Sequence, residues 1–303
     1  MTDVRPLSNT QLPDRRSPSE LLVYSTVRIE CDYKGGEQGT GTGFFFAFAR
    51  REQIFVPAIV TNKHVVDGAV RGTFHIHLRD ASGFPSIQQS DRFVIDSFQS
   101  FWIPHPDPTV DLCVMPITGL IEKAKRNGRG LGFIPLEMTL VPTDQEFTQL
   151  TPLEEVLMIG YPNGIWDSRN NMPILRRGVT ATHPGVEYEG RREFMIDAAC
   201  FPGSSGSPVI LYNTGGYYVP NGSFAIAGTR IQLLGILYAG PQHTVNGELH
   251  VVAVPTRQEI QAISRIPNNL GVVIRSSRLR DFDDQFMRLI AAELGESPDS
   301  GGN

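Results

Sequence analysis

The sequence predicts an all-β protein made of two β units, followed by a C-terminal helix. Many short apolar segments are separated by Gly and Pro turns, a pattern typical of β-sandwiches and β-barrels. Long helical segments do not alternate with these strands, which argues against a doubly wound α/β hydrolase. Only residues 277–294 carry a long run of apolar side chains at helical spacing.

Composition shifts divide the chain into six parts. The polar residues 1–19 contain three prolines and are predicted to be a flexible tail, and residues 296–303 a disordered tail. Between them we place the first β unit at 20–118, a connector at 119–152, the second β unit at 153–265 and a C-terminal helical segment at 266–295. The connector carries Lys123, Lys125, Arg126 and Arg129, which we interpret as a solvated face.

Individual strands follow from the positions of apolar residues. Alternation from Val23 to Ile29 predicts the first strand, and the run 44–48 is too apolar for a strand with a solvated face. A proline precedes residues 256–263, which we expect to be helical. The remaining predicted strands are 54–61, 73–78, 92–98, 112–117, 155–160, 178–182, 194–198, 209–212, 233–238 and 250–254.

Composition also excludes several classes of protein. A net charge of −5 and a pI near 5.8 argue against nucleic-acid binding. No stretch approaches the ~20 apolar residues of a membrane helix, and the charged first twenty residues do not resemble a secretory signal. The three widely spaced cysteines fit reduced thiols better than disulfides or a zinc site, so we expect a cytoplasmic protein without membrane or nucleic-acid partners.

Residues 201–208 (Phe-Pro-Gly-Ser-Ser-Gly-Ser-Pro) are the strongest candidate for a reactive loop. A serine nucleophile needs a tight turn and nearby amide donors that hold a developing oxyanion. Ser205 lies two residues after Gly203, so its hydroxyl and the two amides of Ser205 and Gly203 have the required spacing. The alternative is a polar surface turn, as most such stretches are.

A serine hydroxyl needs a base, and the base needs a carboxylate that holds it in one tautomer. His64 stands at the end of an apolar strand, directly before a turn, and is the preferred base. Asp111 opens an apolar segment and is preferred over Asp107, which lies between two prolines. The order His64, Asp111, Ser205 is that of triad enzymes built on two β-barrels. We expect structural or solvent-facing roles for the other histidines: His75, His77, His105, His183, His243 and His250.

With these residues in hand, the sequence resembles the chymotrypsin-like (trypsin-fold) serine peptidases, most closely the bacterial HtrA/Deg-type and related trypsin-like peptidase domains. Residues 61–69 resemble the histidine block of that family, 107–115 its aspartate block, and 197–199 with 202–206 its serine block. Residues 41–44 and 253–255 resemble its first glycine-rich strand and its last strand. The resemblance spans about residues 21–265 and implies two six-stranded antiparallel β-barrels, with His64 and Asp111 on the first and Ser205 on the second.

The resemblance also implies a reaction class, although the sequence differs from the family pattern in two places. It implies a serine endopeptidase that needs no cofactor or metal, with the amides of Gly203 and Ser205 as the oxyanion hole. Ser207 replaces a glycine of the family, and nothing after residue 265 resembles a PDZ module. Secreted digestive enzymes carry an aspartate where this chain has Ser204, so we expect activity without N-terminal processing.

The expected substrate pocket has no acidic floor. The family's pocket positions correspond to Ala199 and Cys200 at the base and to Tyr238, Ala239 and Gly240 on one wall. An unpaired basic side chain would be costly to bury there, so we expect cleavage after small or medium apolar residues. The alternative is that His250 lines the pocket and shifts the preference toward polar or acidic residues.

The function expected from the sequence is therefore peptide-bond hydrolysis through an acyl-enzyme, with a protein or peptide substrate. We expect a narrow intracellular protein substrate, as in a regulatory or bacterial defence pathway. The alternative is a catalytically inactive or regulated protease-fold protein that acts as a binding partner. The helix 277–294 either packs on the second barrel, docks on a regulatory protein partner, or covers the substrate groove.

Overall fold

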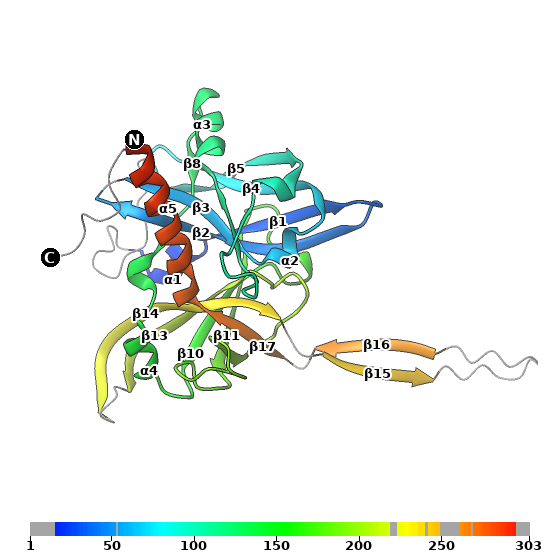
Figure 1. Ribbon diagram of the computed structural model, residues 1–303, viewed down its shortest axis with the longest axis vertical. Helices are drawn as coiled ribbons and strands as arrows, with labels where there is room; N and C mark the ends of the chain where they lie inside the picture. Colours follow the sequence, from blue (N-terminus) through cyan, green and yellow to red (C-terminus); the bar gives the residue numbers. More distant parts are fainter. Residues whose placement is uncertain are drawn as a thin grey trace, which may run out of the picture.

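The computed structural model describes residues 16–52, 54–218, 223–239, 242–248, 261–267 and 269–294. Two β units lie one above the other in Figure 1, and the C-terminal helix runs along one side from the lower unit to the upper one. The all-β class and the C-terminal helix are confirmed. The expected strand 250–254, the tail 296–303 and most of the tail 1–19 lie outside the described residues.

The upper unit is a nine-stranded sheet in which strands neighbour one another in the order β5-β4-β1-β2-β3-β7-β6. It differs from the six-stranded barrel expected there: this path already holds seven strands, and the connector adds two short ones, β8 on β4 and β9 on β2. The strands are β1 (Thr26–Tyr33), β2 (Gln38–Arg51), β3 (Ile54–Thr61), β4 (Ala69–Arg79), β5 (Pro85–Asp96), β6 (Ile103–Pro104), β7 (Cys113–Pro116), β8 (Leu131–Gly132) and β9 (Leu136–Glu137).

The lower unit is a closed barrel in the order β10-β11-β12-β17-β14-β13. Its six strands are β10 (Glu155–Gly160), β11 (Ile174–Thr180), β12 (Glu193–Asp197), β13 (Pro208–Tyr218), β14 (Phe224–Ala239) and β17 (Leu270–Arg275). The barrel extends past residue 265, where the sequence places its end, because β17 pairs with both β12 and β14 and so closes the cylinder.

A two-stranded hairpin is inserted between β14 and β17. Strands β15 (Gln242–Glu248) and β16 (Gln261–Pro267) pair with each other, and the hairpin extends away from the barrel in Figure 1. Helix was expected over 256–263, but from Gln261 onward the chain is strand, because each of these residues has a partner across the hairpin. The preceding residues of that expected helix lie outside the described residues.

Five α-helices connect and cover the strands of the described chain. They are α1 (Pro18–Leu22), α2 (Lys63–Val66), α3 (Thr118–Arg126), α4 (Asp144–Thr148) and α5 (Leu279–Leu294). Helix α1 begins inside the expected N-terminal tail: the Ser17 hydroxyl accepts from the Glu20 amide while the Glu20 carboxylate accepts from the Ser17 amide. This capping box starts a helix whose Leu21 and Leu22 are buried, so order begins earlier than composition suggested.

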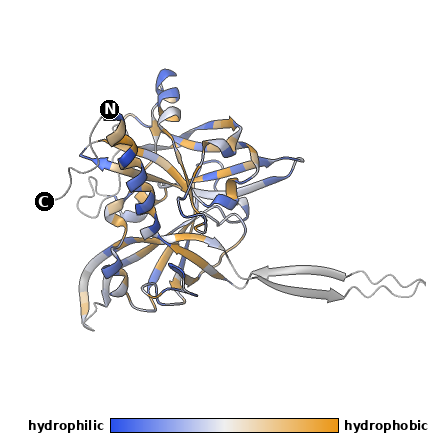
Figure 2. Ribbon diagram, viewed as in Figure 1, coloured by the Kyte–Doolittle hydropathy of each residue, from blue (hydrophilic) through white to orange (hydrophobic). Residues whose placement is uncertain are grey.

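The largest hydrophobic cluster lies between the two units and explains the aromatic run of β2. Phe44, Phe46 and Phe48 point from one face of β2 into this cluster, whereas Phe45 and Ala47 point into the core of the upper unit. Apolar residues accordingly line the facing strands in Figure 2. A strand that is buried on both faces needs apolar residues at every position rather than at alternate ones.

Helix α5 packs on both units, whereas the sequence led us to expect packing on the second barrel. Its Leu279, Phe282 and Phe286 join the cluster between the units. The Phe286 ring lies 5.4 Å from the Phe48 ring, centroid to centroid, and the Asp283 carboxylate accepts from the Ala49 amide at 2.6 Å. The helix therefore joins the end of the lower barrel to β2 of the upper sheet.

We expect Phe286→Ala to lower the free energy of unfolding by about 3–5 kcal/mol, because it removes a buried ring and leaves a cavity between the two units. Urea denaturation followed by intrinsic fluorescence measures the change. Leu289→Ala, on the exposed face of the same helix, is the matched control and should change stability little. Equal losses in the two variants would contradict the packing described here.

Candidate active site

The loop that joins β12 to β13 carries the candidate nucleophile, and its backbone shape depends on two glycines. Gly203 and Gly206 have φ angles of +85° and +87°, which side chains rarely tolerate. A Cβ on Gly206 would lie 1.9 Å from the Thr42 carbonyl oxygen, and one on Gly203 would lie 2.7 Å from the Tyr161 carbonyl oxygen. The loop is thus pressed against neighbouring backbone on both sides of Ser205.

Within this loop, backbone amides that donate to protein carbonyls alternate with amides that do not. The Ser204 amide donates to the Phe201 carbonyl at 3.0 Å, and the Gly206 amide donates to the Leu237 carbonyl at 2.8 Å. The amides of Gly203 and Ser205 have no acceptor among the described residues. Two free N–H groups in one short loop are the kind of donors that an oxyanion hole requires.

Thr42 of β2 joins the serine loop to the upper sheet, and each of its polar groups is hydrogen-bonded. Its hydroxyl donates to the Gly203 carbonyl at 2.9 Å and accepts from the Tyr161 amide at 3.1 Å. Its amide donates to the Ser205 carbonyl at 2.9 Å, and its carbonyl accepts from the Thr61 hydroxyl at 2.7 Å. One buried residue therefore fixes the loop relative to both units.

We expect Thr42→Val to destabilise the fold by about 1–3 kcal/mol and to slow reaction at Ser205, because it leaves the Gly203 carbonyl and the Tyr161 amide without a partner. The shape of the side chain is kept, so packing changes little. Urea denaturation and the rate of labelling by a fluorophosphonate measure the two effects.

The control for this variant is Thr40→Val, two residues earlier on the same strand. The Thr40 hydroxyl has no hydrogen-bond partner among the described residues and is half-buried. A Thr42→Val protein that matches Thr40→Val in both stability and labelling rate would show that the hydroxyl does not hold the loop.

The structure brings His64 and Asp111 together, as the sequence predicts. His64 lies in the short helix α2 directly after β3, and its Nδ1 lies 2.5 Å from Asp111 Oδ2. The His64 amide donates to the other carboxylate oxygen at 3.2 Å. A carboxylate only accepts, so Nδ1 carries the proton and Nε2 is left with a free lone pair. This is the tautomer that a general base needs.

Neighbouring side chains hold both members of the pair. The Asn62 side chain donates to the Asp111 carbonyl at 2.8 Å. The Val65 carbonyl, at the end of α2, accepts from the Tyr33 hydroxyl at 2.9 Å and from the Cys31 thiol at 3.2 Å. Asn62 and Val65 belong to the predicted histidine block, whereas sequence reasoning missed Cys31 and Tyr33, which lie on β1.

Ser205 is not hydrogen-bonded to His64 in the part of the chain that the structure describes. Its hydroxyl points instead to the Tyr238 carbonyl, at 3.4 Å. His64 is about half exposed at 48%, so its ring borders open solvent. Hydrogen bonds between catalytic groups are often loose without substrate and tighten in the complex. To bond to His64 Nε2, the Ser205 hydroxyl would first have to turn away from the Tyr238 carbonyl.

The expected pocket residues are only partly described. Ala199 is half-buried, and its carbonyl accepts from Arg176 at 2.6 Å. Cys200 belongs to the core of the lower barrel and packs on Gly271, where a Cβ would lie 2.5 Å from its sulfur. Tyr238 is half-buried, with its hydroxyl donating to Glu193 at 3.0 Å. Of Ala239 only the backbone is described, and Gly240 lies outside the described residues, as does His250.

Arg176 is a further residue at this loop that sequence reasoning missed. Its guanidinium lies 4.8 Å from the centre of the Phe201 ring, so it contacts the segment that leads into the serine loop. Its Nε atom is buried without a hydrogen-bond partner among the described residues. In sequence, Arg176 is one of two adjacent arginines on a strand, a pattern that normally indicates a solvated face.

All three cysteines are free and buried. Burial raises the pKa of the Cys31 and Cys200 thiols to about 12 and raises that of Cys113 as well. Thiolate is the reactive form, so at pH 8 a thiol of pKa about 12 is ionised in only about one molecule in ten thousand.

We therefore expect iodoacetamide at pH 8 to alkylate the folded protein far more slowly than the protein unfolded in urea, where the thiols regain ordinary pKa values. Mass spectrometry of the intact chain counts the modified thiols over time. Equal rates in the two states would contradict the burial of these cysteines.

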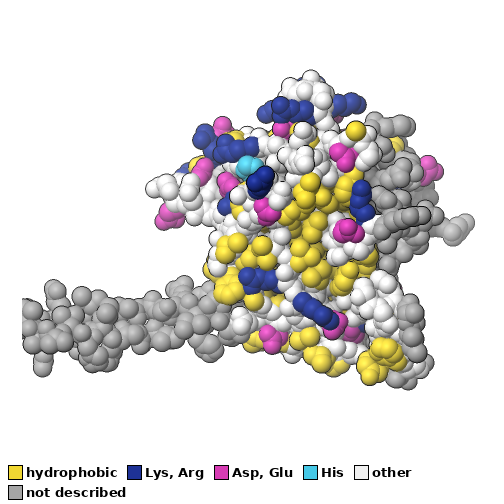
Figure 3. Space-filling model, turned by 180° about the vertical axis from the view of Figure 1, so that it is seen from behind, with side chains coloured by type: hydrophobic (Ala, Val, Ile, Leu, Met, Phe, Trp, Pro, Cys, Tyr) yellow, Lys and Arg dark blue, Asp and Glu magenta, His cyan; other side chains and the backbone are white. Residues whose placement is uncertain are grey.

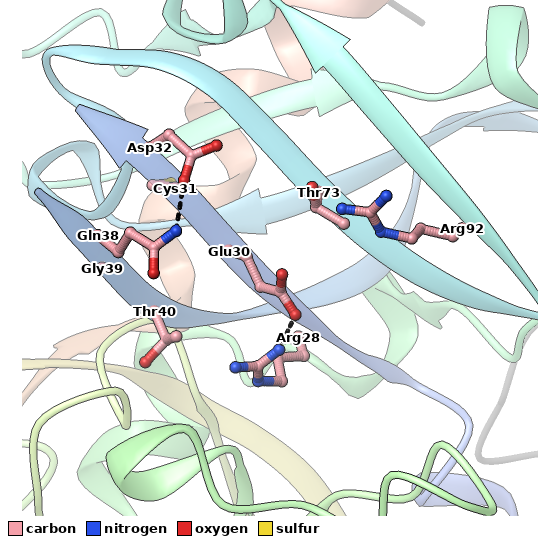
Figure 4. Close-up of a pocket in the computed structure, with 9 residues that line it drawn as sticks. All are labelled: Arg28, Glu30, Cys31, Asp32, Gln38, Gly39, Thr40, Thr73 and Arg92. Carbon is pink, nitrogen blue, oxygen red and sulfur yellow. Dashed lines mark hydrogen bonds and ion pairs between the residues drawn. The ribbon is translucent and has the colours of Figure 1, made fainter. Parts of the chain in front are cut away.

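A polar cavity of about 160 Å³ lies on the outer face of the upper sheet, next to Thr40 (Figure 4). Two basic and two acidic side chains line it (Arg28, Arg92, Glu30 and Asp32); Arg28 pairs with Glu30, and the neutral Gln38 side chain donates to Asp32. The Arg28 guanidinium also lies 5.2 Å from the Trp166 ring. Because acidic and basic side chains balance in this cavity, it has no evident preference for a charged ligand.

The face of the molecule that is turned away in Figure 1 has an apolar surface in its middle. In Figure 3, apolar side chains form a continuous area between the two units, and a histidine side chain lies at its upper margin beside charged groups.

Among the described residues, no three His, Cys, Asp or Glu side chains are grouped as metal ligands. Within the same residues, no helix is long and apolar enough to span a bilayer.

A closed six-stranded antiparallel barrel, an upper β sheet that carries a paired histidine and aspartate, and a glycine-flanked serine between them define the chymotrypsin-like class of serine peptidases. A family model described as a trypsin-like peptidase domain matches residues 41–217, more than half of the chain. The chain therefore belongs to the trypsin-like peptidase family, and the expected class, a serine endopeptidase, is confirmed at this level.

Solved structures similar to the chain are remote in sequence. The HtrA-type protease AlgW with a tripeptide has 15% identity and a TM-score of 0.45, with 88% of this chain and 61% of AlgW covered. The active form of the Rv3671c protease from M. tuberculosis has 15% identity and a TM-score of 0.40 over 98% and 96% of the two chains. Deg5 has 22% identity and a TM-score of 0.40 over 73% and 81%.

The chain thus spans about 61% of the length of AlgW. No curated protein matches the sequence.

Proposed function

We propose that this protein cleaves peptide bonds in a protein substrate through an acyl-enzyme formed on Ser205. The observation that carries the proposal is the His64–Asp111 hydrogen bond of 2.5 Å, on a chain whose serine loop leaves the Gly203 and Ser205 amides free. A base with a free Nε2 and a preformed pair of oxyanion donors are the two parts that a serine hydroxyl needs to become a nucleophile.

In the proposed mechanism, His64 Nε2 takes the proton of the Ser205 hydroxyl as its oxygen attacks the scissile carbonyl carbon. The carbonyl oxygen becomes an oxyanion held by the amides of Gly203 and Ser205. The imidazolium then gives its proton to the leaving amine, and the C–N bond breaks to leave an ester on Ser205. Water, deprotonated by His64, hydrolyses this ester, and the proton returns to Ser205. Asp111 holds the tautomer and stabilises the imidazolium.

We infer that residues before the scissile bond are small or medium and apolar. Neither Ala199 nor Cys200 supplies a carboxylate, and the Arg176 guanidinium lies at the Ala199 carbonyl. A second cation next to Arg176 would be repelled and would have no acidic partner there. Profiling a library of peptides that vary this residue tests the inference, and dominant cleavage after Arg or Lys would overturn it.

We also propose that activity needs no N-terminal cleavage. Ser204 offers no carboxylate to a newly formed ammonium group; its hydroxyl accepts from the Phe201 amide at 3.4 Å. The serine loop is instead supported by Thr42 and by backbone contacts, none of which requires a new chain end.

The test is labelling of the intact chain with a fluorophosphonate, in which Ser205 Oγ bonds to phosphorus and fluoride leaves. We expect one equivalent on the wild-type protein, no label on Ser205→Ala, and turnover of a peptide substrate reduced roughly a million-fold by Ser205→Ala or His64→Ala. Asp111→Asn should lower kcat about 10⁴-fold, because it favours the wrong imidazole tautomer.

A folded wild-type protein that takes no label would favour the alternative, a protease-fold protein that binds partners without catalysis. Label that appears only after the N-terminus has been trimmed would overturn the proposal that no processing is needed. Intact mass measured before and after labelling separates these outcomes.

We also propose a compartment and a substrate class for this enzyme. Three free thiols fit a reducing compartment, so we propose a cytoplasmic enzyme with a narrow protein substrate. Ser205→Ala, which keeps the cleft but cannot form the ester, is the appropriate trap for that substrate in cell extracts. Capture of many unrelated proteins with equal efficiency would contradict narrow specificity.

A further inference from the structure

His105 lies fully buried between the segment that carries Asp111 and the start of helix α5. Its side chain has no exposed surface, although it precedes a proline in a polar stretch. Its Nε2 lies 3.0 Å from Asp281 Oδ2 and 3.1 Å from the Arg278 carbonyl oxygen. The Phe282 ring packs edge-to-face on the imidazole at 5.1 Å.

The tautomer of His105 follows from its other nitrogen. The Asp107 amide donates to Nδ1 at 3.0 Å, and because an amide N–H can only donate, Nδ1 carries a lone pair and Nε2 carries the proton. The Asp107 carbonyl oxygen, 3.3 Å from Nδ1, is then a neighbour without a hydrogen bond to it. That proton can then be donated to the Asp281 carboxylate. His105 therefore joins a backbone amide of the Asp111 segment to a carboxylate of helix α5, with each nitrogen in a defined role.

Asp107 provides a second link between the same two elements. Its carboxylate accepts from the Thr109 amide at 3.0 Å and from the Thr109 hydroxyl at 2.6 Å. It also forms an ion pair with Arg278 at 3.6 Å, and Arg278 in turn lies 3.8 Å from Asp281. These bonds lower the pKa of Asp107, with the Thr109 hydroxyl as the largest cause.

The segment between His105 and Asp111 is held together by backbone hydrogen bonds across its ends, so that its two ends are expected to move together. The His105 amide donates to the Leu112 carbonyl at 2.9 Å, and the Val110 amide donates to the Asp107 carbonyl at 3.2 Å. Lys63, which directly precedes His64 in sequence, also contacts this segment: its Nζ donates to the Pro108 carbonyl at 2.7 Å. A shift of His105 is thereby passed to Asp111, whose carboxylate accepts from His64.

Helix α5 is a rigid support for this segment. Phe282 and Phe286 are buried between the units, and Asp283 is bonded to the Ala49 amide at 2.6 Å. The helix follows β17 with only a 3₁₀ turn (Ser276–Arg278) between them. Its first turn is therefore fixed by both units, independently of the Asp111 segment.

We propose that His105, Asp281 and Arg278 are positioning residues that hold Asp111 in register with His64, so that the C-terminal helix is part of the catalytic apparatus. The inference rests on the proposed function of His64 and Asp111. It goes beyond that function because it assigns a role in the reaction to a helix that contributes no group to the reacting atoms.

The first test compares kcat and KM of wild type, Asp281→Ala and Asp281→Asn on one peptide substrate. Small misplacements of a catalytic group lower rates by on the order of 10- to 100-fold. We expect a loss of that size in kcat for Asp281→Ala with KM nearly unchanged, and partial rescue by Asp281→Asn, whose amide oxygen still accepts from Nε2. Asp281 is 40% exposed, so the variants should fold.

Asp284→Asn is the matched control, because Asp284 is exposed on the same helix and has no hydrogen-bond or ion-pair partner for its carboxylate among the described residues. We expect wild-type kinetics from it. Rates are normalised to the fraction of protein that a fluorophosphonate labels, so that lost folding is not counted as lost catalysis.

A second readout needs no turnover: the downfield proton resonance of His64 Nδ1–H, which reports its short hydrogen bond to Asp111. We expect this signal to broaden or vanish in Asp281→Ala and to persist in Asp281→Asn and Asp284→Asn. Loss of stability in Asp281→Ala without a change in kcat or in this resonance would overturn the positioning role. A wild-type protein that keeps the resonance but takes no label would overturn the proposed function alone.

Discussion

The arrangement of the whole site depends on the hydrogen bonds of Thr42. This residue belongs to the upper sheet, yet its hydroxyl and amide bind the carbonyls of Gly203 and Ser205 in a loop of the lower barrel. Those bonds fix the carbonyls of Gly203 and Ser205 against the upper sheet, while the amides of the same two residues have no acceptor among the described residues. Buried backbone groups are expensive to leave unpaired, so the loop has one favourable shape.

Two supports hold the segments that carry the candidate catalytic residues. The serine loop is held by β2 through Thr42, whereas the Asp111 segment is held by helix α5 through His105. Strand β2 and helix α5 in turn pack on each other through Phe48, Phe282 and Phe286. The hydrophobic cluster between the units is therefore the common base of both supports, although it contributes no polar group to the site.

The sequence predicted the fold class and the pairing of His64 with Asp111, because apolar runs and short motifs carry that information locally. It placed the end of the barrel too early, since strand β17 pairs with partners distant in sequence and the hairpin before it interrupts the pattern. Arg176 was missed, and the expectation for His105 went no further than a structural or solvent-facing role, for a related reason. Each is an ordinary polar residue in sequence, and only tertiary packing brings it to the reactive segments.

The position of β17 and α5 near the end of the described chain has a consequence for biosynthesis. Domains fold progressively as the ribosome makes them, from the N-terminus onward. Until residues 270–294 emerge, the barrel lacks its closing strand, and the segment bearing Asp111 lacks its helical support. A nascent chain therefore carries His64, Asp111 and Ser205 before the strand and helix that complete the fold around them.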